Sequence, residues 1–272
     1  MKLYIIGNGF DLAHNLPSHY SDFAAFCKEK DSFFYKSMND LFPKLTPTEE
    51  KLWSNFEEGL GEPDLKYLDR FYNNYINNPG NDGFLKIFYD IKNYFKEWVI
   101  SLKEKTLGLK PIYDLDKNSI FLSFNYTDTL ETVYKISSGK ILHIHGYEDD
   151  VQAESFFVGY IFGHGREKLM QTSHIDSREY LYNDFVNGFR KDYQIDEISS
   201  FLRNFPTIEE IIVYGHSMNK IDNPYFEIIK NQYPEAKWNI EYHIKYCKDK
   251  EGKESNIHRL QIDNYKLIKS IS

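Results

Sequence analysis

Four short apolar runs in the sequence are each followed at once by polar residues that can do chemistry. The polar turns are GNGFD at 7–11, NYTD at 125–128, HGYED at 145–149 and GHSMNKID at 215–222. Histidine, asparagine and aspartate side chains can accept protons, orient a ligand or stabilise developing positive charge. Because ligands of open parallel sheets bind beyond the carboxyl ends of the strands, these turns predict one shared site.

The first turn, GNGFD, contains two glycines that suit a tight bend. Gly7 and Gly9 let the backbone approach a phosphate closely, and the helix behind them would favour its negative charge. The motif lacks the third glycine and the later acidic residue of a dehydrogenase fingerprint. Taken alone, it predicts a tight turn equally well with or without a nucleotide.

His145 is the strongest candidate for a general base, because an unperturbed imidazole titrates near pH ~6.5. The alternative is a histidine that is merely hydrogen-bonded at the sheet edge. His143 lies two residues earlier on the same strand face, and an H-x-H pair can bind a metal if His164, His216 and Asp11 converge on it. No spaced third ligand is evident, so we expect no metal and keep a metal-dependent nuclease or hydrolase as an alternative.

Asn125 and Asp11 also have structural explanations. Asparagine is a favoured helix cap, but Thr127 or Asp128 can cap the same helix and leave Asn125 available for a ligand. An aspartate in the first turn of a helix is favoured by the helix dipole, so Asp11 is explained equally well by helix stability and by ligand contact.

The bulk composition limits the classes of protein that the chain can form. With 272 residues, 41% of them hydrophobic, it can bury a core without disulfides or metals. The formal charge of −8 disfavours an extensive nucleic-acid surface. Two widely separated cysteines, no signal-peptide pattern and no membrane-length apolar stretch predict a cytoplasmic protein without membrane contact.

The alternation of apolar runs, polar turns and helical patterns predicts an α/β fold with a parallel sheet flanked by helices. The predicted strands are 3–6, 119–124, 140–144, 210–214 and 238–244, and the predicted helices are 18–30, 127–137 and 222–232.

Helix-period apolar residues between about 31 and 112 interrupt this alternation and predict an inserted helical module after the first βα unit. The Rossmann-like α/β nucleotide-binding domain would then comprise residues 1–30 and 113–272. A further helical stretch is expected near 176–204. KDKEGKES at 248–255 is expected to be an exposed turn between strands.

The four turns resemble motifs of sirtuin-type NAD-binding proteins. GNGFDLAHNLPSHY at 7–20 resembles their first loop, which reads G-A-G-x-S, then three residues, then G-I-P and an aromatic residue. Asp11 replaces the serine of this loop, and Asn15 replaces the glycine of G-I-P. SFNYT, HIHG and GHS resemble the later T-x-N-Y/I-D, x-L-H-G and G-T-S segments, in the same order.

A closer resemblance extends over nearly the whole chain. LYIIGNGFDLAH, YSDF, WSNFE, FNYTDTLE, HIHG, FGHG and VYGHS resemble segments of the AbiH family of bacterial phage abortive-infection proteins. The family resemblance implies a role in anti-phage defence, with a phage-derived trigger or a second copy of the chain as possible partners.

The sirtuin resemblance implies that NAD or NADP binds at these turns and is cleaved between nicotinamide and ribose. Asn125 matches the asparagine that orients the ribose and a water, and His145 matches the general base. Asp11 would contact a ribose hydroxyl or support the developing cation. The chain lacks the four zinc-binding cysteines of the deacylases, which favours hydrolysis of the dinucleotide over protein deacylation. The residues expected to contact the dinucleotide are Gly7, Asn8, Gly9, Phe10, Gly146, Gly215, His216 and Ser217.

A binding module from a different functional class remains open beside the enzyme. It would sense the dinucleotide without releasing nicotinamide, and binding would then raise the thermal stability of the chain.

Overall fold

The computed structural model describes residues 1–45, 53, 55–70, 83–146, 160–169, 177–243 and 247–270. The chain divides into two compact units. Unit 1 contains Met1–Pro17, Leu102–Tyr160 and Tyr193–Ser272, and unit 2 contains Ser18–Ser101 and Ile161–Asp192.

These units are groupings by compactness, and they place 18–30 and 161–192 with the helical part of the chain. The domain boundaries at residues 30 and 113 stay a prediction. In the part of the chain that the structure describes, no helix has the length and apolar character needed to cross a membrane.

Unit 1 is built on a six-stranded sheet in which every neighbouring pair of strands is parallel. The strand order is β3-β2-β1-β4-β5-β6. The predicted α/β class with a parallel sheet flanked by helices is therefore confirmed. The strands are β1 (Lys2–Ile6), β2 (Ile120–Ser123), β3 (Ile141–His143), β4 (Glu210–Tyr214), β5 (Lys237–Tyr242) and β6 (Tyr265–Lys269).

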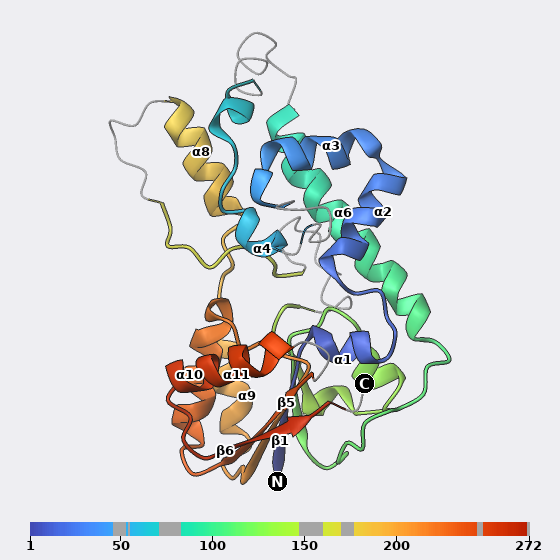
Figure 1. Cartoon of the computed structure of the whole chain (residues 1–272), viewed down its shortest axis with the longest axis vertical. Helices are drawn as coiled ribbons and strands as arrows, with labels where there is room; N and C mark the ends of the chain where they lie inside the picture. Colours follow the sequence, from blue (N-terminus) through green and yellow to red (C-terminus); the bar gives the residue numbers. More distant parts are fainter. Residues whose placement is uncertain are drawn as a thin grey trace. The chain divides into compact units, whose positions relative to one another are not determined.

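Both faces of this sheet are buried, which explains why its central strands are continuously apolar. In β1, Leu3 and Ile5 pack into one core cluster, whereas Tyr4 and Ile6 pack into the cluster on the opposite face. The first face is covered by three helices grouped together in Figure 1, and the second by two short helices. The helices on the first face are α9 (Ile195–Arg203), α10 (Asn223–Gln232) and α11 (Cys247–Arg259). Those on the second face are α1 (Asn8–Ala13) and α7 (Thr129–Thr132).

The expected turn at 248–255 is wrong, because these residues lie inside helix α11. Lysine and glutamate are good helix formers, and the helix needs only a narrow apolar stripe. Ile257 and, one residue after the helix, Leu260 supply that stripe, and the side chain of Lys253 is buried one turn earlier; each of the three is at most 5% exposed. The strand β6 that follows was not predicted from the sequence.

The predicted helix at 127–137 is confirmed only as the short α7. Lys135 has a φ of 56°, and the N–H of Ile136 donates to the carbonyl oxygen of Leu130 at 3.1 Å. A left-handed residue is a feature of a helix C-terminal cap, and the N–H of Lys135 makes the bond of such a cap to the Glu131 carbonyl oxygen at 3.1 Å. The chain therefore leaves the helix earlier than its apolar spacing indicates.

Unit 2 is helical, and aromatic side chains fill its core. The Phe23 ring lies 5.2–5.4 Å, between ring centroids, from the rings of Trp53, Phe56, Phe95 and Trp98. These contacts account for part of the high aromatic content of the chain as core packing. The helices are α2 (Tyr20–Lys30), α3 (Ser32–Leu41), the 3-10 turn η1 (Pro43–Leu45), α4 (Phe56–Gly59), most of α6 (Gly83–Thr106) and α8 (Ser177–Gly188).

Candidate functional site

The four polar turns begin at the same edge of the sheet in unit 1. Ile6 of β1 is aligned with Ser123 of β2 and with Tyr214 of β4, and Ser123 is aligned with His143 of β3. The residues that follow these four positions therefore leave the sheet side by side. β1 lies between β2 and β4, where the order of the strands reverses, and this is the place at which open α/β sheets bind ligands.

The glycines of the first turn bring it against the turn that follows β4. The N–H of Gly7 donates to the Tyr214 carbonyl oxygen and that of Gly9 to the Gly215 carbonyl oxygen, both at 2.9 Å. A Cβ on Gly7 would lie 2.5 Å from the Cα of His216, and one on Gly9 would lie 2.7 Å from the Cα of Gly215. Turn packing therefore requires both glycines, and it occupies both of their N–H groups.

The other residues expected to contact a dinucleotide differ in exposure. Asn8 and Ser217 are exposed at the rim, and Gly146 is half-buried with a φ of 81°. The Phe10 ring is fully buried, with its centroid 5.0 Å from that of Tyr113. The N–H of Phe10 donates to the Gly7 carbonyl oxygen at 2.9 Å, and its carbonyl oxygen lies 2.7 Å from Nδ1 of His14, so the main chain of Phe10 is also engaged within the protein.

Asp11 is buried behind the turns and accepts hydrogen bonds from the segment after β2. Its two carboxylate oxygens accept from the hydroxyls of Thr127 at 2.6 Å and Thr129 at 2.7 Å. The side-chain amide of Asn125 also donates to this carboxylate. Burial raises the pKa of Asp11 to about 6, against the lowering effect of these hydrogen bonds. The carboxylate therefore organises the Asn125 segment.

Asn125 is 4% exposed, and its side-chain carbonyl oxygen is buried without a hydrogen-bond partner among the described residues. It does not cap α7, whose N-cap residue is Asp128. A buried acceptor without a partner costs about 1–3 kcal/mol, and native proteins keep few of them. The amide is held on its nitrogen side by Asp11, so its oxygen is set to accept a donor from a ligand or from water.

His145 has a defined proton arrangement. Its Nδ1 lies 2.9 Å from the carbonyl oxygen of Phe124, which can only accept, so Nδ1 carries a proton. Nε2 is then the basic nitrogen of the neutral ring, and it lies 3.8 Å from Oδ1 of Asp222. The ring packs against Phe124 and Tyr126, with centroid distances of 5.4 and 5.6 Å. A nitrogen base in a largely apolar wall is suited to proton transfer.

Asp222, which sequence reasoning missed, joins His145 to the predicted site residue His216. Oδ2 of Asp222 lies 3.4 Å from Nε2 of His216, and the aspartate is 7% exposed. It closes the turn GHSMNKID and is the N-cap residue of α10, yet its side chain makes no cap hydrogen bond. The position of an aspartate at the end of this polar turn was the available signal.

The histidines of the metal alternative have protein partners. Nε2 of His164, in unit 2, lies 2.8 Å from the Val186 carbonyl oxygen, and its Nδ1 accepts the N–H of Arg166. In unit 1, Nε2 of His143 lies 2.8 Å from Oε1 of Glu131. Over the described ranges, no group of three histidine, cysteine or acidic side chains is arranged to hold a metal.

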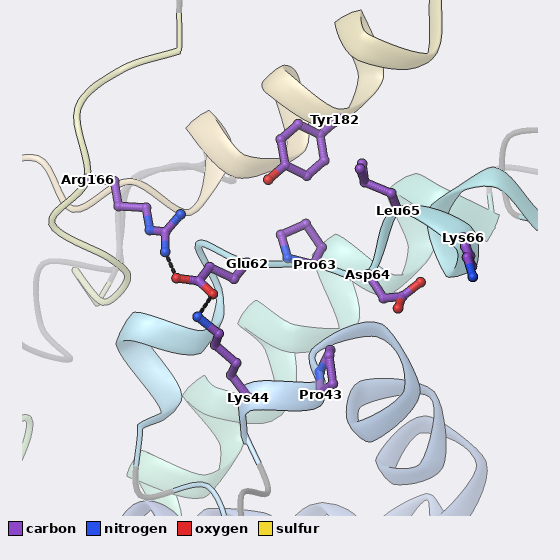
Figure 2. A pocket seen from close by; sticks show the side chains of 9 residues that line it. All are labelled: Pro43, Lys44, Glu62, Pro63, Asp64, Leu65, Lys66, Arg166 and Tyr182. Carbon is purple, nitrogen blue, oxygen red and sulfur yellow. Dashed lines mark ion pairs between the residues drawn. The ribbon is translucent and has the colours of Figure 1, made fainter.

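Unit 2 contains a separate surface pocket of about 680 Å³. Figure 2 shows Glu62 between two cations, with ion pairs to Lys44 and Arg166, and Tyr182 on the opposite wall beside Pro63. The Glu62 carboxylate thus already pairs with the positive charges of Lys44 and Arg166. Among the described residues that line this pocket, no buried polar atom lacks a hydrogen-bond partner, so the pocket carries less chemical information than the sheet edge of unit 1.

The fold and the edge together define an α/β protein with a parallel sheet whose polar turns converge at the carboxyl ends of the central strands. The family described as "Bacteriophage abortive infection AbiH" matches residues 3–242, and the chain belongs to this family. The match supports a role in phage abortive infection. No curated protein and no solved structure matches the chain significantly.

Proposed function

We propose that the chain serves abortive infection by binding NAD or NADP at the sheet edge of unit 1 and hydrolysing the bond between nicotinamide and ribose. The proposal treats the sheet as a Rossmann-like, sirtuin-like core. The strand order supports it, because a 3-2-1-4-5-6 order places a dinucleotide across the first and fourth strands in nucleotide-binding folds.

The buried carbonyl oxygen of Asn125 is the observation that carries this proposal. An acceptor in this position needs a hydroxyl or N–H donor, and a ribose hydroxyl or an attacking water supplies one. The nitrogen side of the amide is fixed by Asp11, so the oxygen cannot turn away without breaking that bond. We therefore assign Asn125 to ligand contact and Asp11 to positioning Asn125, in place of direct contact between Asp11 and the sugar.

His145 would act as the base. As the bond between C1′ and the nicotinamide nitrogen breaks, its electron pair leaves with nicotinamide and the ribose gains cationic character. A water oxygen then bonds to C1′ and its proton passes to Nε2 of His145. The Nδ1 bond to Phe124 keeps the ring in the tautomer that this step requires. The occupied N–H groups of Gly7 and Gly9 leave the diphosphate to other contacts at the rim.

The test measures nicotinamide release from NAD and from NADP by the purified chain, with and without chelator, and the NAD content of cells during phage infection. We expect Asn125→Ala and His145→Ala to abolish consumption. Asn264→Ala and His258→Ala, exposed positions in the same unit, are the matched controls and should retain it.

The other outcomes separate the alternatives. Thermal stabilisation by the dinucleotide without released nicotinamide would identify a sensing module, and activity lost with chelator would support a metal-dependent hydrolase. If neither dinucleotide is consumed in infected cells nor bound by the purified chain, the proposal is refuted.

A further inference from the structure

Two imidazoles and one carboxylate form a buried cluster in unit 1 that the sequence did not reveal. His145, His216 and Asp222 are each at most 7% exposed, and the carboxylate has one oxygen toward each ring. A carboxylate in this position stabilises positive charge on either ring. The hydrogen bonds of the two rings decide which of them can carry that charge.

His216 is held in a neutral form by its own turn. Its Nδ1 accepts the main-chain N–H of Met218 at 2.9 Å, which requires a lone pair on Nδ1. The ring proton is therefore on Nε2, which faces Asp222 at 3.4 Å. Protonating Nδ1 would break the bond to Met218 and leave a buried N–H without its acceptor.

Charges from the neighbouring helix oppose a cation on His216. The ammonium group of Lys253, on α11, donates to the carbonyl oxygen of His216, and Arg259 donates to that of Met218 at 2.8 Å. Two fixed cations at the main chain of this turn raise the free energy of a third on the His216 ring.

His145 has the opposite arrangement. Its Nδ1 donates a proton to the Phe124 carbonyl oxygen, so the ring can gain a second proton on Nε2 without losing that bond. The new N–H would face Asp222 at 3.8 Å. At the same edge of the sheet, Nε2 of His143, on β3, lies 2.8 Å from Oε1 of Glu131, on α7.

We propose that Asp222 is a positioning residue that keeps His216 neutral as the Nε2–H tautomer and makes His145 the ring of the pair that takes up a proton. The charge states follow from this cluster alone. Their use in catalysis rests on the proposed function, with His145 as the base.

The experiment records long-range ¹H–¹⁵N spectra of the full chain labelled with ¹⁵N-histidine, between pH 5 and 8.5, without nucleotide. His145→Gln and His216→Gln assign the two rings. We expect His216 to show the neutral Nε2–H pattern over the whole range, and His145 to pass from Nδ1–H to the doubly protonated form as the pH falls.

Asp222→Asn should lower the His145 midpoint by about 1–3 pH units, the usual effect of removing one close opposite charge. Asp263→Asn, an exposed carboxylate in the same unit, should leave it unchanged. A doubly protonated or Nδ1–H His216 in the unsubstituted chain overturns the proposal even if Asp222→Asn does not fold. A His145 midpoint that is unmoved in folded Asp222→Asn also overturns it. The spectra need no substrate, so absence of NAD hydrolysis would sink the proposed function and leave these charge states standing.

Discussion

Replacing Asp11 with asparagine should remove a loss in the free energy of unfolding that the buried Asp11 carboxylate causes near neutral pH. Burial raises the pKa of Asp11 from its ordinary value of 3.8 to about 6. Between these two pH values the folded chain binds more protons than the unfolded chain, so the free energy of unfolding falls as the pH rises. A shift of about two pH units corresponds to roughly 3 kcal/mol, and this loss is complete above about pH 6.

Urea denaturation at several pH values between 4 and 7 measures this effect. The free energy of unfolding of the native chain minus that of Asp11→Asn should fall by roughly 3 kcal/mol across the range, since other carboxylates cancel in the difference. Asp116→Asn is the matched control. The N–H of Asn118 and the hydroxyl of Ser119 lower the pKa of Asp116 below its ordinary 3.8, so its contribution rises with pH mainly below the measured range, and the same difference should stay nearly level between pH 4 and 7. A flat difference for Asp11→Asn would refute the reasoning.

Three further substitutions test other contacts by chemical denaturation. Gly7→Ala should lower the free energy of unfolding by about 1–3 kcal/mol, because its methyl group would meet the main chain of the turn after β4. Gly139→Ala, with no neighbour within 4 Å, should lower it by less than about 1 kcal/mol. Equal losses would contradict this reasoning. Tyr134→Phe should cost about 1–3 kcal/mol, because its buried hydroxyl lies 2.8 Å from Nε2 of His14 and accepts two main-chain N–H groups; an unchanged midpoint would show that these groups find other partners. Glu62→Gln, in the unit 2 pocket, should change stability by less than about 1 kcal/mol, because its ion pairs are at the surface; a larger loss would indicate a structural network there.

The strands of the sheet could be predicted well because burial on both faces leaves a simple signature. β4 was predicted at its observed bounds, and β1, β2, β3 and β5 within two residues at either end. Helix α11 was missed because a helix that packs on the sheet through one narrow stripe needs few apolar residues. β6 was missed because its residues are mostly exposed or half-buried and do not form an apolar run.

The candidate site could be located from the sequence, but its internal contacts could not. Asn125 and His145 were singled out because each follows an apolar strand in a polar turn. The bond between Asp11 and Thr127 joins residues 116 positions apart, and no local pattern encodes it. The contacts of Asp222 are likewise not encoded locally, since His145 lies in a different polar turn.

The C-terminal helix has a consequence for how the chain can be shortened. The family match ends at residue 242, yet Lys253, Asn256 and Arg259 of α11 bind the carbonyl oxygens of three successive residues, 216–218. A protein cut at the family boundary would retain both imidazoles of the cluster and lose the clamp that fixes the loop carrying one of them.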